Sequence, residues 1–293
     1  MDQRSPDTTG DPVVLTGLGI AEGIPCDSRP YLVDRKNRKF MGPQDELAVI
    51  ATANALQSAG LMERTLGERA GLFMAIGYIP FEKTDIELIC ENATDNGNFS
   101  MRQFSTVAYH KINPLLTFRC LPNMPAFHIS MNFDIRGPYF VTYPGPGQYY
   151  MALHRACESL ACGEADIAVV GAVAHQRNFL VEHHFRRIAS TVEAQLLRDA
   201  SGCLILEQES HARARSAKIK GKLRALSLRY LPHDPDAESP PSLLERCADE
   251  EIPEGEWGPC LLPVALNYHA SGTFRHVLQA PDGIVASSTW EMA

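Results

Sequence analysis

The residues best placed to do chemistry would lie in the turn of a strand–turn–helix segment near the middle of the chain. Tyr139–Tyr143 is an apolar run typical of a strand, Pro144–Gly147 forms a sharp turn, and Gln148–Cys162 has helical spacing. Such a turn often presents a nucleophile in α/β enzymes, because the helix N-terminus stabilises developing negative charge. Here the turn is Pro-Gly-Pro-Gly, which contains no nucleophilic side chain. The segment has the architecture of a catalytic turn without the reactive group.

A few other side chains near this segment could replace a nucleophile or act as a base. They are Gln148, Cys157, Cys162, His128, His154 and His269. The simpler interpretation is structural for each: a glutamine that opens a helix, thiols buried in packing, and histidines with satisfied hydrogen bonds. His269 is the most plausible base, but one histidine without a nucleophile makes no mechanism. We therefore predict no catalytic residue.

Composition excludes several classes of function. The chain has 293 residues, 45% of them hydrophobic, and a net charge of -8, so it favours a globular protein and gives no reason to bind nucleic acid or an anionic membrane. No apolar run reaches the roughly 20 residues that span a bilayer. The eight cysteines form no CxxC pair, and the ten histidines have no metal-ligand spacing. We expect a cytoplasmic protein with reduced thiols and neither metal nor cofactor.

The order of elements predicts a layered α/β architecture, with two strand-rich halves around helices. Apolar runs predict strands, besides the one before the turn, at Pro12–Ile20, Ala70–Gly77, Ala165–Val173, Ser201–Glu207, Ile219–Tyr230 (as an edge strand), Cys260–Leu266 and Gly272–Gln279. Helices are predicted at Gln44–Leu61, Phe81–Cys90, Phe99–His110, Asn123–Phe133 and Glu209–Lys218. Residues 1–11 are predicted to be a disordered tail and residues 231–260 an irregular connection.

Six segments, in this order, resemble the β-ketoacyl synthases, the condensing enzymes of fatty acid and polyketide synthesis. The segments span residues 12–20, 34–61, 121–138, 152–173, 199–223 and 267–279. The resemblance implies a thiolase-like layered α-β-α-β-α fold with a reduced C-terminal half. Residues 12–230 are then a ketosynthase-like N-terminal region, and residues 261–293 are a remnant of the C-terminal half.

The chain departs from this family where the family does chemistry. Counting forward from Gly137 and back from Gly163, both routes place the family's catalytic cysteine at Pro146. The two histidine motifs of the family's C-terminal half are absent as well. Decarboxylative condensation needs a thiolate to carry the acyl chain and donors that stabilise the enolate. The resemblance is therefore to a truncated chain-length factor, which has no independent activity and belongs to a β-ketoacyl synthase (acyltransferase) complex.

The resemblance to chain-length factors also implies partners and an interface. Such a subunit heterodimerises with an active ketosynthase, receives chains from an acyl carrier protein, and serves type II polyketide, polyene or fatty acid biosynthesis. Family dimers pair the strand before the turn, which implies an interface at Tyr139, Phe140, Val141, Thr142 and Tyr143. Bulky side chains that precede this strand close the partner's acyl tunnel, which implies gating by Phe99, Met101, Phe104 and Leu116. Tyr109 and Phe118 share this region, and for the aromatic residues ordinary core packing is the alternative.

Two other functions remain open at this point. The chain could be a degenerate enzyme with residual acyl transfer, hydrolysis or decarboxylation that uses His269, His128 or a repositioned cysteine. It could instead be a homodimeric scaffold or ligand-binding protein without a ketosynthase partner. Labelling of one cysteine by an acyl mimic would favour the enzyme, and a stable homodimer would favour the scaffold.

Overall fold

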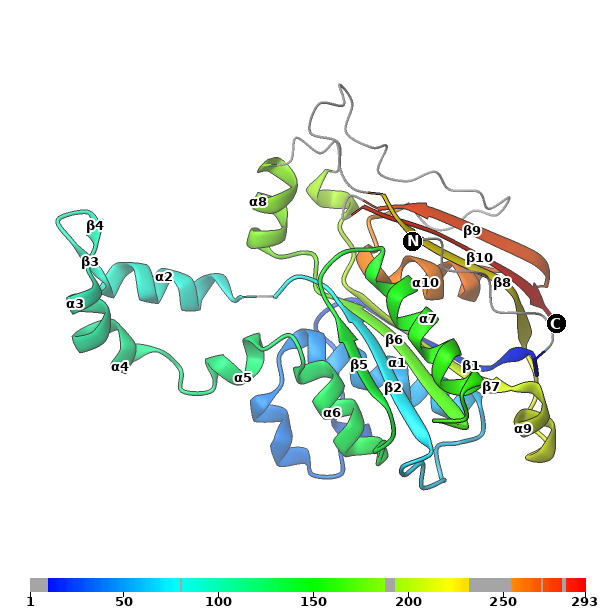
Figure 1. Cartoon of the computed structure of the whole chain (residues 1–293). Helices are drawn as coiled ribbons and strands as arrows, with labels where there is room; N and C mark the ends of the chain where they lie inside the picture. The colour runs from blue at the N-terminus through cyan, green and yellow to red at the C-terminus, as the bar shows by residue number, and fades with distance from the viewer. Residues whose placement is uncertain (1–9, 80, 188–192, 232–253, 270, 281–282) are drawn as a thin grey trace.

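The computed structural model describes residues 10–79, 81–187, 193–231, 254–269, 271–280 and 283–293. Most of the predicted tail at 1–11 and most of the predicted connection at 231–260 lie outside these ranges. The described elements form a layered α/β body from which one helical segment projects (Figure 1).

Five strands of the N-terminal region form the first sheet. They are β1 (Val13–Glu22), β2 (Ala70–Ile76), β5 (Tyr139–Thr142), β6 (Ile167–Ala174) and β7 (Ala200–Gln208), in the spatial order β5-β2-β6-β7-β1. The β5, β2 and β6 strands are parallel, whereas β7 runs antiparallel to both β6 and β1. All seven residues of β2 are buried, as expected for a parallel strand with helices on both faces.

Three strands of the C-terminal region continue this sheet. They are β8 (Gly221–Tyr230), β9 (Gly272–Gln279) and β10 (Ile284–Met292), antiparallel in the order β8-β10-β9. Only two residue pairs join β8 to β1, Val14 with Lys222 and Leu15 with Gly221, so these three strands form a second, nearly separate sheet. The prediction that residues 219–230 form an edge strand is wrong, because β8 lies between β1 and β10.

Helices lie on both faces of the first sheet. The helices α1 (Pro43–Ser58) and α6 (Met124–Phe133) share a core with Leu72 and Met74 of β2. The helices α7 (Gln148–Ala161) and α10 (Leu261–Tyr268) share the other core with Phe73 of β2, and this core also holds Trp290 of the second sheet. Since alternate residues of a strand point to opposite faces, α7 and α10 lie between the two sheets.

Two glycines in β1, Gly17 and Gly19, lie where the helix α1 approaches the strand most closely. A Cβ on Gly17 would lie 2.3 Å from the carbonyl oxygen of Ala55, and one on Gly19 would lie 2.3 Å from that of Ala51. The absence of a side chain at these positions therefore lets α1 pack directly against the strand.

The predicted strand at Cys260–Leu266 is wrong. A 3-10 turn (Gly258–Cys260) leads into α10, and the first six residues of this helix are all buried. A helix enclosed between two sheets is apolar on every side and shows no 3.6-residue period, so its short apolar run cannot be told from a buried strand.

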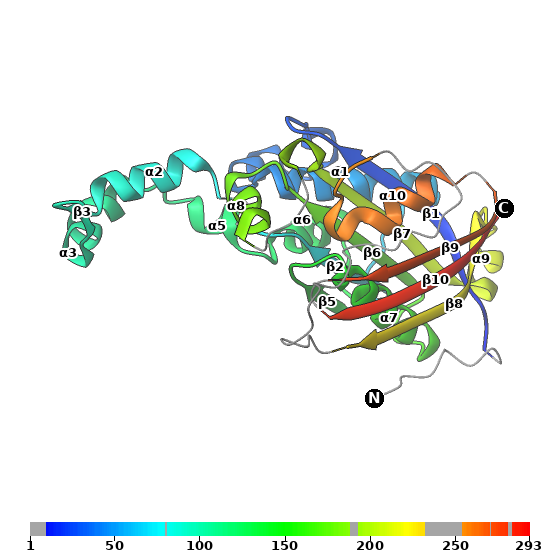
Figure 2. The ribbon, with the colours of Figure 1, turned by 90° about the horizontal axis from the view of Figure 1, so that it is seen from above.

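The outer face of the second sheet is polar. Phe274, Leu278 and Trp290 point inward and are buried, while Arg224 and Arg275 point outward and are exposed. In the described part of the chain no helix covers this outer face (Figure 2). The C-terminal half is reduced at this layer, and the alternation of its strands suits a sheet with one face in water.

The two halves repeat one arrangement. The order β6-β7-β1 is mirrored by β9-β10-β8, and the buried helix α7 precedes β6 as α10 precedes β9. Among the described strands the second half has no counterpart of β2 and β5. In the described part of the chain, the second half therefore consists of the strands that enclose α7.

Between β2 and α6 the chain leaves the body. The helix α2 (Lys83–Asn92), the short strands β3 (Thr94–Asp95) and β4 (Asn98–Phe99), and a helical run made of α3 (Met101–Gln103), a π-helical turn (Phe104–Ala108) and α4 (Tyr109–Lys111) project from it (Figures 1 and 2). Residues 83–111 are called the arm below. The chain returns through α5 (Leu116–Cys120), and two further helices, α8 (Phe179–Arg187) and α9 (Glu209–Ala214), lie elsewhere on the body.

Candidate functional site

The predicted strand–turn–helix segment is present. The β5 strand ends at Thr142, and α7 begins at Gln148. Pro146 lies in the turn between them and is partly buried, and the Thr142 hydroxyl donates to the Gln148 carbonyl oxygen at 3.1 Å. The Thr142 hydroxyl thus closes the backbone across the turn, and the four residues of the turn supply no nucleophile.

The first turn of α7 is fastened to the second sheet. The Tyr150 hydroxyl lies 2.6 Å from Nδ1 of His276 on β9 and 3.1 Å from Oγ of Ser288 on β10. The indole Nε1 of Trp290 donates to the same Ser288 oxygen at 3.0 Å. All four side chains are buried, and burial raises the pKa of Tyr150 well above its usual value, so the phenol stays a neutral hydrogen-bonding group.

Polar side chains that were not singled out from the sequence gather at the same edge of the first sheet. Tyr78 follows β2, His175 follows β6, and Asp199 precedes β7. Ala75 near the end of β2 pairs with Thr142 of β5 and with Ala172 of β6, so the ends of these strands lie at the same sheet edge as the turn. Nε2 of His175 lies 4.0 Å from Oδ1 of Asp199. The sequence signal was weak: a single polar residue beside each apolar strand, at the edge where open α/β sheets bind ligands.

The histidines named from the sequence are dispersed. His128 is buried on α6, across the sheet from α7, and burial lowers its pKa to about 4. His154 lies in the middle of α7, with Nδ1 3.7 Å from Oε2 of Glu158. His269 directly follows the last residue of α10. At the other end of this helix, Gly258 of the preceding 3-10 turn packs against Gln176, which follows β6. His269 therefore lies at the far end of α10 from this edge.

The two cysteines of α7 are also remote from the turn. Cys157 is buried, and burial raises the pKa of its thiol to about 12, so it is the packing thiol that was expected. Cys162, at the C-terminal end of the helix, is exposed. The expectation of a buried thiol is wrong there, because the helix ends at this residue and turns into solvent at Gly163.

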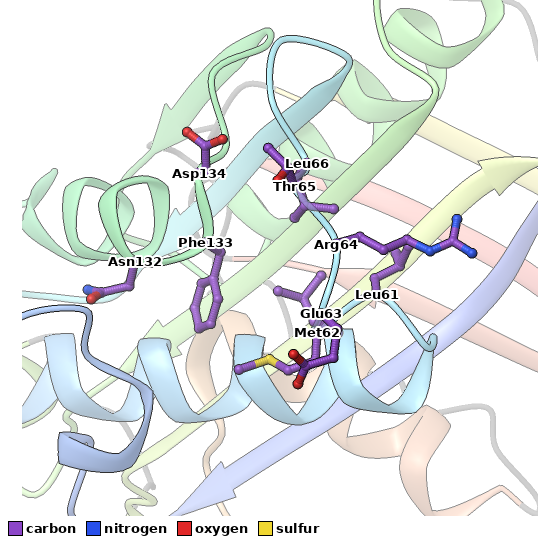
Figure 3. Close-up of a pocket in the computed structure, with 10 residues that line it drawn as sticks. Leu61, Met62, Glu63, Arg64, Thr65, Leu66, Asn132, Phe133 and Asp134 are labelled. Carbon is purple, nitrogen blue, oxygen red and sulfur yellow. The ribbon is translucent and has the colours of Figure 1, made fainter.

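A pocket of about 270 Å³ lies between the loop after α1 and the end of α6 (Figure 3). Its lining residues come from the end of α1, the following loop and the end of α6: Leu56, Leu61, Met62, Glu63, Arg64, Thr65, Leu66, Asn132, Phe133 and Asp134. Gly67, just before β2, pairs with Ile135, just after α6, so the pocket lies near the start of β2 and the turn lies near its end. The pocket is therefore not part of the polar edge described above.

The predicted interface strand lies at the sheet edge. Among the described strands β5 pairs with β2 alone, and the side chains of Tyr139 and Tyr143 are 55% and 42% exposed. Phe127 and Met131 on α6 and Met151 on α7 are exposed as well. Because α6 and α7 lie on opposite faces of the sheet, apolar side chains flank the edge on both sides. Together these residues are called the β5 surface.

The predicted gating residues fall in two places. Phe99 and Met101 lie on the arm and are each 66% exposed, and the ring of Phe104 lies 6.2 Å from that of Phe99. Tyr109, also on the arm, is exposed. Leu116 lies instead on α5, where it lines a small pocket of about 40 Å³ with Met41 and Pro43 among others. The core interpretation does not hold for Phe99 and Tyr109, which have no core around them.

No metal site or membrane span is found in the described ranges. Their His, Cys, Asp and Glu side chains form no group of three that could hold a metal ion. None of their helices is both long and apolar enough to cross a membrane.

The two sheets with α7 and α10 between them define a thiolase-like α/β protein. The chain belongs to the β-ketoacyl synthase family: residues 12–194 match the family model described as "Beta-ketoacyl synthase, N-terminal domain".

Solved structures share this fold. A type II polyketide synthase complex, AntDE:AntF, described as an acyl-carrier protein with its ketosynthase, aligns over 97% of this chain and 100% of the matched chain, with a TM-score of 0.69 at 13% identity. The ishigamide ketosynthase/chain length factor aligns over 96% of this chain and 99% of the other, with a TM-score of 0.66 at 14% identity. At these identities the likeness establishes the fold.

Curated relatives are mostly far longer than this chain. Polyketide synthase ThaG of Burkholderia thailandensis is 33% identical over 155 residues, which cover 53% of this chain and 2% of ThaG. Highly reducing polyketide synthase ltbA of Aspergillus luteorubrus is 28% identical over 168 residues, or 57% of this chain and 5% of ltbA. Nodulation protein E of Rhizobium leguminosarum bv. trifolii is 23% identical over 285 residues, 89% of this chain and 66% of that protein.

Proposed function

We propose that this chain is a non-catalytic ketosynthase-like subunit, a chain-length factor. It pairs through the β5 surface with an active β-ketoacyl synthase and shapes that partner's acyl tunnel in type II polyketide or polyene biosynthesis. The observation that carries the proposal is the combination of a nucleophile-free turn with an exposed, apolar strand edge directly before it.

The turn supports the non-catalytic half of the proposal. Pro146 occupies the position of the family's cysteine, and the histidines named from the sequence lie on other elements, away from the turn. His175 and Asp199 lie 4.0 Å apart at this edge, but neither side chain replaces the thiol that carries an acyl chain through a condensation. The chain therefore depends on a partner for chemistry.

The contrast between the two sheet edges supports the pairing half. Among the described strands the edges are β5 and β9. The β9 strand carries exposed Thr273, Arg275 and Gln279, the kind of polar residues that discourage pairing at an edge. The β5 strand has no charged residue, and Phe127 and Met131 on α6 and Met151 on α7 add exposed apolar side chains. An uncharged edge with an apolar surround suits a permanent partner strand.

The arm supports the role in tunnel shape. Phe99, Met101 and Tyr109 expose large apolar side chains on a segment that belongs to neither of the two hydrophobic cores. Such side chains need a surface to cover them. A partner ketosynthase that receives acyl chains from an acyl carrier protein offers one, and bulky side chains at its tunnel would stop chain growth by excluded volume.

Co-expression with the ketosynthase encoded beside this chain tests the proposal. The expected result is co-purification of the two subunits and condensation by the pair with a defined product length. A ketosynthase that is equally soluble, equally active and unchanged in product length without this chain would overturn the proposal. Condensation or thioester hydrolysis by the isolated chain would favour the degenerate enzyme, and a stable homodimer that ignores the ketosynthase would favour the scaffold.

A further inference from the structure

Two hydrogen bonds fasten α8 to the segment from which the arm leaves the sheet. The Tyr78 hydroxyl, two residues after β2, lies 2.7 Å from Nε2 of His184 on α8. The amide Nδ2 of Asn178, which precedes α8, donates to the carbonyl oxygen of Phe81 at 2.7 Å. Residues 78 and 81 lie directly before α2, the first helix of the arm, so both bonds act on the root of the arm.

Asn178 serves the helix and the root at once. Its side-chain Oδ1 accepts from the Leu180 backbone N–H at 2.9 Å, and its carbonyl oxygen accepts from the Glu182 N–H at 3.0 Å. These bonds start α8 while the amide nitrogen of the same side chain holds Phe81. The start of α8 and the root of the arm are therefore fixed to each other.

The helix α8 has little other packing in the described structure. Of its nine residues, all described, Val181 alone is fully buried. Burial, and secondarily the charge of Arg187, lower the pKa of His184, so near neutral pH its imidazole is neutral and can accept the Tyr78 hydroxyl. The rings of Tyr78 and His184 also lie 4.7 Å apart, which adds a packing contact to the hydrogen bond.

The length of the arm makes its root decisive. The ten residues of α2 span about 15 Å at 1.5 Å per residue, and Phe99 and Met101 lie beyond its end. A small rotation of the chain at Tyr78 and Phe81 therefore displaces these exposed side chains by several ångströms. A surface that is to be covered by a partner cannot tolerate such a displacement, because complementary packing is lost over fractions of an ångström.

We infer that Tyr78, Asn178 and His184 are positioning residues that set the direction of the arm through α8, and thereby align Phe99 and Met101 with the partner subunit. This inference rests on the proposed function for its biological consequence, since the arm must meet a partner. The orientation of the arm itself is a property of the isolated chain, so it can be measured without the partner.

The first experiment measures arm orientation in the full-length chain alone. Cys90 on α2 and Cys162 at the end of α7 are both exposed, and they take spin labels after Cys26, Cys120 and Cys247 are replaced by alanine. The expected result is a narrow Cys90–Cys162 distance distribution that broadens in Tyr78→Phe, Asn178→Ala and His184→Leu. His184→Gln restores an acceptor for Tyr78 and should restore the narrow distribution.

Matched controls separate positioning from general stability. Tyr149→Phe removes a buried tyrosine hydroxyl bonded to the Val170 carbonyl oxygen at 3.3 Å, and Asn54→Ala removes an amide bonded to the Ile20 carbonyl oxygen at 3.0 Å. Both should lower the melting temperature as the arm-root variants do and leave the distance distribution unchanged. A distribution that is equally broad in the wild type, or that broadens equally in the controls, would overturn the inference.

The second experiment measures the dissociation constant of the complex with the ketosynthase. Tyr78→Phe, Asn178→Ala and His184→Leu should each raise the dissociation constant about tenfold, which corresponds to the net contribution of one hydrogen bond. The two control variants should leave the dissociation constant unchanged. If the arm-root variants broaden the distance distribution but no ketosynthase binds even the wild type, the proposed function fails and the positioning role stands. If binding is intact in every arm-root variant while Tyr139→Lys abolishes it, the positioning role fails and the proposed function stands.

Discussion

The Tyr150 hydroxyl lies 2.6 Å from Nδ1 of His276, across the interior from α7 to β9. These residues are 126 positions apart in the chain. The contact joins the first helical turn of α7, which follows the Pro144–Gly147 segment, to the second sheet. Ser288 is a second partner of the same hydroxyl. We therefore regard the reduced C-terminal half as the support of α7 and of the strand edge before it.

Tyr150→Phe tests this support. The variant removes one hydroxyl from a fully buried network, so the free energy of unfolding should fall by about 1–2 kcal/mol, measured by guanidinium unfolding. Tyr149→Phe is the matched control, since its hydroxyl makes a longer bond of 3.3 Å to one carbonyl oxygen. Equal losses in the two variants would show that the link to His276 has no special weight.

A buried carboxylate ties α9 to the body. Glu207 is fully buried, and Arg215 bonds its Oε1 at 2.6 Å and also donates to the Ala59 carbonyl oxygen at the end of α1. Arg215→Met should cost about 3 kcal/mol of unfolding free energy, the low end for breaking a buried pair, because the Glu207 carboxylate then keeps only Thr16 and His211 as partners. Arg213→Met removes an exposed arginine from Glu209, which keeps Lys222 as a partner, and should cost under about 1 kcal/mol. Similar losses would contradict the account.

The pH dependence of the same group has a definite sign. Burial acts to raise the pKa of Glu207, but the hydrogen bonds from Arg215 and Thr16 outweigh it and hold the pKa below the usual 4.5. A carboxyl with a lowered folded pKa stabilises the protein above its unfolded pKa, and this stabilisation is lost as pH falls through the folded value. The stability of the wild type should therefore fall with acid below pH 4.5.

The burial of His128 predicts a loss of stability that begins at a higher pH than the loss from Glu207. Burial lowers its pKa from 6.5 to about 4, and neither ring nitrogen has a hydrogen-bond partner in the described part of the structure. The neutral form is fully favoured above pH 6.5, and up to about 3 kcal/mol is lost between pH 6.5 and 4 as the unfolded chain takes up the proton. His128→Leu should flatten the unfolding free energy over this range, whereas the exposed His183→Leu should not. An unchanged slope in His128→Leu would refute the assignment.

Restoring the missing thiol tests whether the turn alone limits chemistry. In Pro146→Cys, mass spectrometry should detect at most slow acylation of the new thiol by an acyl thioester, and no condensation product. The reason is that the sequence also lacks the family's two histidine motifs, and the proposed function therefore provides no donors for the enolate of the condensation. Condensation by the isolated Pro146→Cys chain would show that the acid/base groups had been present all along.

Local sequence patterns predict most of the helices and strands. The strand–turn–helix segment is contiguous, and the alternation in β9 and the buried run of β2 follow directly from residue type. α10 was mistaken for a strand because its enclosure by two sheets removes any period. The position of β8 inside the sheet depends on its pairing with β10, about sixty residues away, which no local pattern reveals.

The site was harder to predict than the fold. The position of Pro146 follows from counting between Gly137 and Gly163 along one contiguous segment, and its match to the family's cysteine stays a prediction. The placement of Tyr78, His175 and Asp199 at one sheet edge arises from strand order, which no local sequence pattern reveals. Exposure of Phe99 and Tyr109 could not be foreseen, since an apolar residue on a projecting arm has the same local sequence as one in a core.

The central claim is that the β5 surface holds a ketosynthase partner, and the mass of the complex tests it most directly. Native mass spectrometry of the wild-type chain with the ketosynthase should show a one-to-one heterodimer. The double variant Tyr139→Lys, Tyr143→Lys should abolish it, and Tyr230→Lys, which changes an exposed tyrosine at the end of β8, should leave it intact. A heterodimer that survives the double variant, or a wild-type chain that forms none, would contradict the account.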